Sequence, residues 1–270
     1  MKPVEVPASL PLVASVSPHP VSRLRLWLGL LVLAGLGLLS ATPLLLSVLR
    51  AMLAGRTLPM PLGVVLLLQD LQALILASLA AAVGVWTAPR VGLDAPLVRA
   101  RLAGEPVTDR LLGLLPTSVL AGSVSAGAVL VLSLALKSHL PAGLGELPGM
   151  SPWVGATGAF YGGIVEELLC RWGLLSLIAF LLLRLGLGGS VGFWTANVTA
   201  AVVFGLSHLP AALRLGLPRT PLAVGYLVAA NAVAGLVFGW LFRKRGLESA
   251  MLAHASADVW LHAVFPALGV

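Results

Sequence analysis

The chain of 270 residues has 17 Lys or Arg and 10 Asp or Glu, so charged residues make up 10% of it. Soluble globular domains carry about 25%. Hydrophobic residues make up 59% of the chain, and its mean hydropathy is +1.01. So few charges cannot cover a core of this size with polar groups, which excludes a water-soluble domain. The hydrophobicity excludes a disordered chain, and the single Cys170 excludes a disulfide scaffold.

Seven apolar runs are long enough to cross a bilayer, which requires about 20 apolar residues in a helix. In chain order they are 26–49, 62–87, 111–136, 153–183, 191–212, 221–242 and 248–267. Clusters of Pro, Gly and Arg separate many of them, and such clusters break helices. The first run is too long for the apolar region of a cleaved signal peptide, so we expect it to be retained. The sequence predicts an all-α polytopic membrane protein with about seven transmembrane helices.

Three regions are expected along the chain. Residues 1–22 contain four prolines and no periodicity, which predicts a flexible N-terminal tail. Residues 23–150 hold three transmembrane helices without a diagnostic motif. Residues 151–270 hold the other four, and we expect them to form a catalytic helical bundle, because bundle sites are built by side chains from facing helices.

The loop charges predict an orientation. If the runs alternate in direction, eleven of the 17 Lys and Arg residues lie on one side, five lie on the other, and Arg171 lies within a run. Cytoplasmic loops carry the excess of Lys and Arg. We therefore expect a cytoplasmic N-terminus, in a plasma (inner) membrane. The net charge of +7 then reflects orientation and not a nucleic-acid partner.

Ionisable side chains inside the apolar runs are the informative residues, because each costs about 2.5 to 3.5 kcal/mol to insert. In the run 153–183, Glu167 and Arg171 are four residues apart with the acid first, the favourable order for an ion pair. Glu166 lies about 100° away around the helix and has no partner there. It shares its face with Cys170, which we interpret as a small buried residue. An unpaired carboxylate with this free-energy cost of membrane insertion indicates a functional site.

Two later runs supply histidines. His208 lies near the outer end of the run 191–212, four residues after Phe204. The run 248–267 contains a column at four-residue spacing, formed by His254, Asp258 and His262. His262 lies near the end of its run and is expected to be structural or interfacial. In straight parallel helices, His208 near the outer end of its run would not reach His254 near the inner end of its own, so tilt or a broken helix near Pro210 is required.

One carboxylate and two imidazoles support two chemistries. Glu166, His208 and His254 are a set that can hold Zn²⁺ with an open position for water, with Asp258 orienting an imidazole. Without a metal, Glu166 would act as general base on water, while a histidine and Asp258 would hydrogen-bond the developing oxyanion. The residues leave both chemistries open. In the second run, Gln69, Asp70 and Gln72 are expected to form a packing cluster or a polar lining.

The motifs occur in a fixed order on late runs: Glu-Glu-x-x-x-Arg from residue 166, Phe-x-x-x-His from 204 and His-x-x-x-Asp from 254. In this order, over about residues 150–265, the chain resembles the CAAX prenyl protease and bacteriocin-processing (CPBP, Abi) family. The resemblance implies an all-helical intramembrane endopeptidase. It also implies two sets of site residues, which are the catalytic Glu166, His208, His254 and Asp258 and the supporting Glu167 and Arg171. The prenyl-processing branch usually has Asn where this chain has Asp258.

The first hypothesis is therefore an intramembrane peptidase. It would cut near the C-terminus of a membrane-anchored or lipidated protein or peptide, in prenyl-type, sorting-signal or bacteriocin-related processing. A proton-coupled transporter is a second hypothesis, because Glu and His relays carry protons in membranes. A non-catalytic immunity or binding protein on the same fold is a third. All three require the lipid bilayer as a partner, and none requires nucleic acid.

Overall fold

The computed structural model describes residues 21–53, 60–140 and 151–269 of the chain. Within these ranges the ordered elements are all helices and no strand is present. The tail expected over residues 1–22 lies almost entirely outside the described residues. Its last residue, Ser22, caps the first helix, because its hydroxyl accepts a hydrogen bond from the backbone N–H of Arg25 at 3.2 Å.

Five long helices are apolar enough to cross a membrane. They are α1 (Arg23–Met52), α2 (Leu62–Thr87), α4 (Thr108–Leu136), α7 (Gly189–Ser207) continued by α8 (Leu209–Arg214), and α9 (Pro221–Arg245). They coincide with five of the seven apolar runs. Shorter connecting elements are η1 (Ala88–Val91), α3 (Pro96–Leu102) and η2 (Lys137–His139). The prediction of an all-α polytopic membrane protein is confirmed.

The fourth and seventh runs are also helical but are divided into shorter segments. The fourth comprises α5 (Pro152–Thr157), η3 (Tyr161–Glu166), η4 (Leu168–Leu175) and α6 (Ser176–Arg184), and the seventh comprises α10 (Leu247–Val259), η5 (Trp260–Val264) and α11 (Phe265–Ala267). The segments η3, η4 and η5 are π-helical. Turns of this kind inside helices are frequent at functional sites. Apolar length predicts that a run is helical, but it does not specify the hydrogen-bond pattern within the run.

Small residues let the helices approach one another closely. A Cβ on Gly122 of α4 would collide with the carbonyl of Ala253 in α10. On α2, a Cβ on Gly84 would collide with the indole of Trp172 in η4, and that indole donates a hydrogen bond to the carbonyl of Ala81 at 3.1 Å. These contacts pack α2 directly against η4 of the fourth run and α4 directly against α10 of the seventh run.

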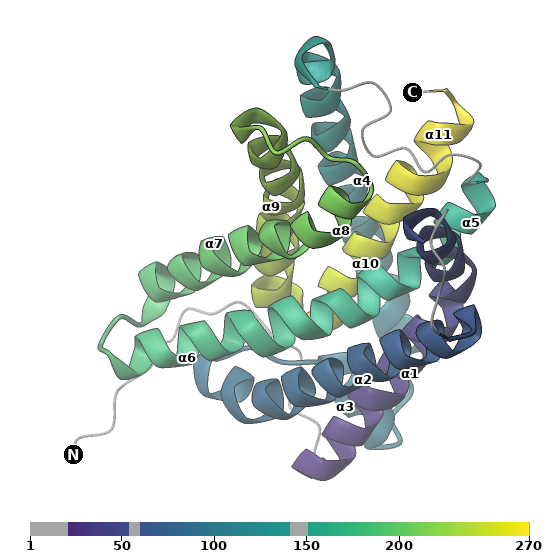
Figure 1. Ribbon diagram of the computed structural model, residues 1–270. Coiled ribbons are helices and arrows are strands. Elements are labelled where there is room, and N and C mark those ends of the chain that lie inside the picture. Colours follow the sequence, from purple (N-terminus) through teal and green to yellow (C-terminus); the bar gives the residue numbers. More distant parts are fainter. Residues whose placement is uncertain (1–20, 54–59, 141–150, 270) are drawn as a thin grey trace.

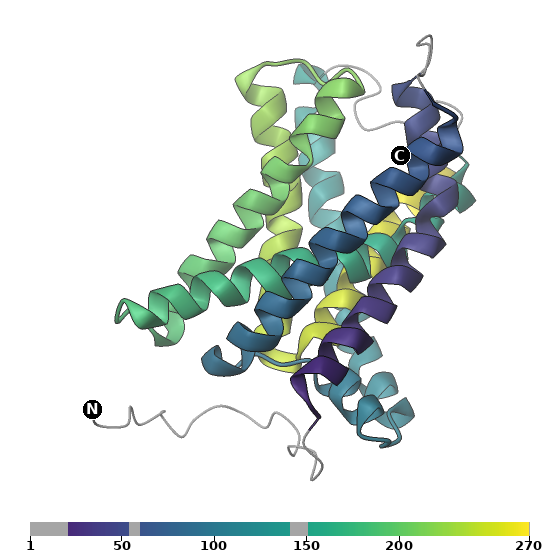
Figure 2. The same ribbon diagram turned by 60° about the horizontal axis from the view of Figure 1, so that its bottom comes forward.

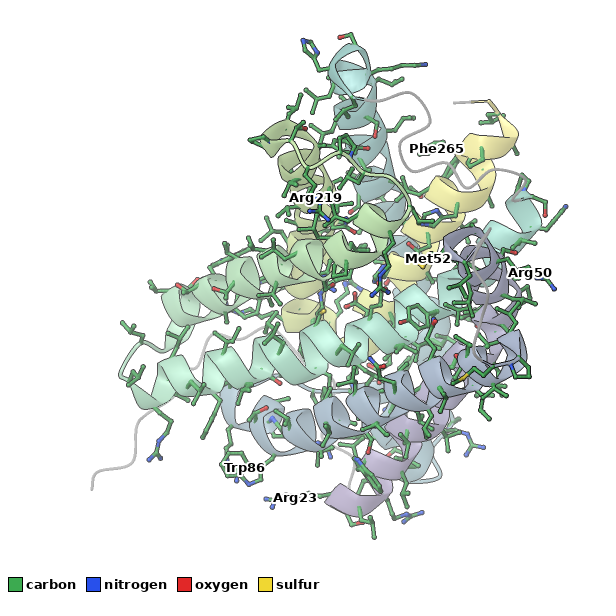
Figure 3. The ribbon with its side chains drawn as sticks, in the orientation of Figure 1. Arg23, Arg50, Met52, Trp86, Arg219 and Phe265 are labelled. Carbon is green, nitrogen blue, oxygen red and sulfur yellow. The ribbon has the colours of Figure 1, made fainter. Side chains whose placement is uncertain are left out.

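The helices are not parallel to one another. Figures 1 and 2 show α6 and α7 projecting together from one side of the bundle, with α1 on the opposite side. In Figure 1, α7 runs obliquely to α4 and α9. Figure 3 shows Arg23 and Trp86 toward one end of the molecule and Arg50 and Arg219 toward the other. This placement agrees with the alternation of runs expected from the sequence, while the membrane face of each end stays a prediction.

Candidate active site

Glu167 is the most enclosed residue of the site. Its side chain is 0% exposed, and it lies where η3 meets η4. Its Oε1 accepts a hydrogen bond from Nη1 of Arg171 at 2.8 Å, so the ion pair predicted from the four-residue spacing is present. The same oxygen lies 2.7 Å from Nδ1 of His254 and accepts that N–H. A buried carboxylate thus joins the fourth run to the seventh.

His254 projects from α10 toward the end of η3. Its Nε2 lies 3.6 Å from Oε2 of Glu166 and 3.7 Å from Oδ1 of Asp258. Because Glu167 accepts from Nδ1, the ring is held with Nε2 directed at these two carboxylates. The column of His254 and Asp258 predicted from the sequence therefore faces Glu166.

His208 lies at a break between α7 and α8. Pro210 has no N–H, so the ladder of α7 cannot continue through it, and the backbone N–H of His208 bonds instead to the carbonyl of Gly205 at 3.3 Å. The ring Nδ1 is 2.8 Å from the carbonyl of Phe204, to which it donates. Its Nε2 then faces Oε1 of Glu166 at 3.9 Å.

The sequence raised the difficulty that His208 and His254 would lie at different depths, but the structure brings them together. Straight parallel helices would hold His208 and His254 at different depths, but both lie within 4 Å of Glu166. The oblique course of α7 and the break before Pro210 account for this (Figure 1). Four residues from three runs, Glu166, His208, His254 and Asp258, are therefore brought together.

The distances from the Glu166 carboxylate to the two histidine rings indicate what can bind between them. At 3.6 and 3.9 Å, the carboxylate oxygens are too far from the two Nε2 atoms for direct hydrogen bonds. Polar groups that face one another across more than 3.5 Å are commonly bridged by water. When the Nδ1 atoms carry the protons of neutral imidazoles, each Nε2 is an acceptor. The arrangement therefore suits a molecule that donates hydrogen bonds to both sides, as water does.

Exposure divides the site into an accessible part and a buried part. The side chains of Glu166 and His208 are 22% and 33% exposed, whereas Arg171 is 1% exposed and His254 is 6% exposed. A molecule can thus reach the Glu166 carboxylate. The groups that orient the site are shielded, which strengthens their electrostatic interactions.

Two aromatic rings pack around the charged groups. Phe238 of α9 stacks on His254 with ring centroids 4.7 Å apart, and Phe204 meets the same imidazole edge-on at 5.7 Å. The guanidinium of Arg171 lies 4.9 Å from the Phe204 ring centroid and 5.4 Å from that of Phe238. Such cation–π contacts stabilise a desolvated cation. The sequence did not single out Phe238, because a Phe within an apolar run has no distinguishing signal.

Glycines let η3 approach α10. A Cβ on Gly162 would collide with Oδ2 of Asp258, and a Cβ on Gly163 would collide with the carbonyl of Met251. Only glycine at these positions allows the backbone that precedes Glu166 to lie so close to the seventh run. The Gly-Gly pair four residues before the two glutamates was a usable signal in the sequence.

Two residues of the predicted columns take no part in these contacts. His262 lies on η5 with its side chain exposed, and its structural or interfacial role stays a prediction. Cys170 is a free thiol and is only partly buried, so the prediction of a buried residue was too strong.

The side chains of Glu166, His208 and His254 can also be compared with the ligands that zinc prefers. Two imidazole nitrogens and a carboxylate are ligands that Zn²⁺ accepts. Within residues 21–53, 60–140 and 151–269, no group of three His, Cys, Asp or Glu side chains is placed to hold a metal ion. Zinc binding by Glu166, His208 and His254 stays a prediction, which metal analysis of the purified protein tests.

Comparison with protein families matches residues 148–260 to the model described as type II CAAX prenyl endopeptidase, Rce1-like. Comparisons with curated proteins and with solved structures give no match. The matched stretch contains every residue that meets at Glu166, from η3 through α10. Residues 148–260 are therefore similar to the Rce1-like family of type II CAAX prenyl endopeptidases, in agreement with the resemblance predicted from the order of the motifs.

Proposed function

We propose that this protein is an intramembrane endopeptidase that hydrolyses a peptide bond with a water molecule activated by Glu166. One observation supports the proposal above the others. The partly exposed Glu166 carboxylate faces Nε2 of His208 and Nε2 of His254, while the Nδ1 atoms of both rings are engaged elsewhere. The family match over residues 148–260 supports the same reaction class.

In the first step, water occupies the gap between Glu166 and His208. It donates one hydrogen bond to the carboxylate and one to Nε2 of His208. Glu166 accepts a proton as general base while the water oxygen forms a bond to the scissile carbonyl carbon. The carbonyl π electrons move to oxygen, which gives a tetrahedral oxyanion.

His254 and Asp258 stabilise that oxyanion in the proposal. They lie on the α10 side of Glu166, with Nε2 and Oδ1 3.7 Å apart. For this step His254 would be an imidazolium, which donates from Nδ1 to Glu167 and from Nε2 to the oxygen, and Asp258 would be protonated and donate its O–H. The oxyanion then collapses, the carbon–nitrogen bond breaks, and Glu166 returns its proton to the leaving nitrogen. The products are a new carboxyl terminus and a free amine.

Glu167 and Arg171 position these groups without touching the substrate. Glu167 fixes the His254 ring through Nδ1, and Arg171 balances the charge of Glu167 inside the bundle. In this proposal Glu166 is the reactive acid and Glu167 is the structural one, because the Glu166 side chain is 22% exposed and that of Glu167 is 0% exposed.

The substrate in this proposal is a membrane-anchored or lipidated protein or peptide, cut near its C-terminus. Prenyl-type, sorting-signal and bacteriocin-related processing all fit this description. The Asp at position 258, where the prenyl-processing branch usually has Asn, favours the second and third. The protein would lie in the plasma (inner) membrane with its N-terminus in the cytoplasm, because the Arg-rich ends of the runs gather on one side.

The test is a proteomic comparison of C-terminal fragments. A strain that lacks the protein is complemented with the wild-type chain or with the Glu166→Gln variant. We expect shortened C-termini of specific membrane proteins with the wild-type chain only. Equal processing by Glu166→Gln would contradict the mechanism. Full biological function of the Glu166→Ala and His254→Ala variants would instead select the binding protein, and proton-coupled flux in liposomes that survives loss of cleavage would select the transporter.

A further inference from the structure

Arg171 has a hydrogen-bond donor that the proposed mechanism does not use. Its Nη1 donates to Oε1 of Glu167 at 2.8 Å, whereas its Nη2 is enclosed and has no hydrogen-bond partner among the described residues. The side chain is 1% exposed, so bulk solvent does not reach it. A charged donor that is buried without a partner costs free energy, and buried polar groups are almost always paired. We therefore expect an acceptor for Nη2 close by.

Asn197 of α7 has the complementary acceptor. Its Nδ2 donates a hydrogen bond to the backbone carbonyl of Leu236 in α9 at 3.0 Å, which fixes the orientation of the amide. The other amide atom, Oδ1, is enclosed and has no partner in the part of the chain that the structure describes. Asn197 is 1% exposed, like Arg171. A buried donor on η4 and a buried acceptor on α7 are thus both unpaired, and these two segments pack against each other.

Both unpaired atoms lie against the same side of α9. A Cβ on Gly235 would lie 2.9 Å from Nη2 of Arg171, and a Cβ on Gly239 would collide with Oδ1 of Asn197. The two glycines are four residues apart, which is about 6 Å along a helix. The donor and the acceptor are therefore separated by roughly one helical turn, and they are not bonded to each other. Two hydrogen bonds placed end to end span about 5 to 6 Å.

One water molecule has the size and the chemistry to pair both atoms. It would accept a hydrogen bond from Nη2 of Arg171 and donate one to Oδ1 of Asn197. Buried waters typically make about three hydrogen bonds to polar groups that would otherwise be unpaired. Oε2 of Glu167 is a third enclosed acceptor without a partner among the described residues. An uncharged ligand suits the site, because Glu167 already balances the charge of Arg171.

We propose that one buried water molecule is bound between Nη2 of Arg171 and Oδ1 of Asn197, and that Asn197 acts through it as a positioning residue. The guanidinium would then be held at both ends, by Glu167 through Nη1 and by the water through Nη2. Glu167 in turn holds Nδ1 of His254 at 2.7 Å. The chain of hydrogen bonds thus runs from α7 through the fourth run to the imidazole that faces Glu166. The positioning role rests on the proposed function, whereas the water site does not.

A structure of the wild-type chain in nanodiscs, at a resolution that shows ordered water, tests the site itself. We expect a density peak about 2.7 to 3.2 Å from both Nη2 of Arg171 and Oδ1 of Asn197. The Asn197→Leu variant should show no peak there, because Leu has a similar shape but no acceptor. A direct bond from Nη2 to Asn197 or to Oε2 of Glu167, with no water between them, overturns the proposal. This measurement requires no cleavage, so its failure is distinct from failure of the proposed function.

Initial rates of cleavage test the positioning role with a double-mutant cycle. Arg171→Lys keeps the positive charge but has no Nη2, and Asn197→Leu keeps Nη2 but removes its link to α7. In metal sites, loss of an outer group that orients a histidine typically costs about 10- to 100-fold in activity, and we expect kcat to fall about tenfold in each variant. Because both variants remove the same link, the double variant should be no slower than the slower single one. KM should stay near the wild-type value, since neither side chain contacts the substrate.

The matched control is Asn231→Leu. Asn231 of α9 is partly buried, and its Nδ2 donates to the carbonyl of Leu227 at 2.8 Å, so the same change removes the same kind of amide-to-carbonyl bond. We expect wild-type kcat for this variant. Asn197→Ala replaces Asn197→Leu if the larger side chain prevents folding, which thermal unfolding in detergent shows. Losses that multiply in the double variant, or equal kcat values for Asn197→Leu and Asn231→Leu, overturn the positioning role.

Discussion

Oε1 of the fully buried Glu167 lies 2.7 Å from Nδ1 of His254, and this contact joins two segments that are 87 residues apart in the chain. It sets which ring nitrogen faces the accessible acid. Carboxylates that bond to the second nitrogen of a functional imidazole commonly fix its tautomer and orientation. The neighbouring Glu166 side chain is 22% exposed and stays accessible.

Glu167→Gln is expected to lower both stability and activity. The amide keeps a hydrogen-bond acceptor but removes the charge that balances Arg171, and an uncompensated buried charge costs about 3 to 5 kcal/mol. Thermal unfolding in detergent measures the first effect. The double variant Glu167→Gln/Arg171→Met should recover most of the lost stability, since no buried charge is then left unpaired, but not the activity. A double variant as unstable as the single one would contradict this role of the pair.

Asp258→Asn and Asp258→Ala are expected to differ. Removing a single oxyanion donor typically costs 10²- to 10³-fold in kcat, and we expect that loss for the Ala variant. Asn can donate an N–H from nearly the same position, so Asp258→Asn should retain kcat within about tenfold of wild type. Initial rates of cleavage in proteoliposomes check both values. Equal losses in the two variants would show that Asp258 acts through its charge and not as a donor.

Gly162→Ala should impair catalysis through geometry alone. The added Cβ would collide with Asp258, and a small misplacement of reacting groups can cost about 10²-fold in rate. Overpacking of this kind also destabilises by about 1 to 3 kcal/mol. Gly127→Ala is the matched control, because a Cβ there meets nothing within 4 Å. Cleavage rates and melting temperatures of the two variants are compared, and equal behaviour would exclude the close approach.

Treatment with a zinc chelator tests whether water is activated by protein groups alone or by a bound metal ion. The reaction proposed here uses protein groups alone, so exhaustive treatment with a zinc chelator should leave the cleavage rate unchanged. Metal analysis of the purified protein should find less than one equivalent of zinc. Loss of activity that zinc restores would instead assign Glu166, His208 and His254 as ligands.

Much of the fold could be predicted from the sequence, because crossing a bilayer requires length and apolarity that are visible in one dimension. The bounds of α2 agree with the predicted run 62–87 residue for residue. The π-helical turns around Glu167 could not be predicted, since they depend on how η3 and η4 pack against their neighbours. Apolar pattern alone does not distinguish hydrogen bonds to the fourth residue from those to the fifth.

The site could be predicted where spacing along one helix sufficed. The Glu167–Arg171 pair needed only a separation of four residues. His208 reaches His254 because α7 runs obliquely. The sequence indicated that tilt or a broken helix was required, but it did not predict the direction of the helix. Phe238 was missed because its role comes from stacking on an imidazole of another helix.

The most direct test of the account is cleavage of an identified substrate by purified Glu166→Gln protein in proteoliposomes, beside the wild-type chain. Gln fills the same space but cannot accept a proton from water, so we expect a folded protein with binding retained and cleavage at least about 10²-fold slower. Cleavage by Glu166→Gln at the wild-type rate would contradict the assignment of Glu166 as the group that activates water.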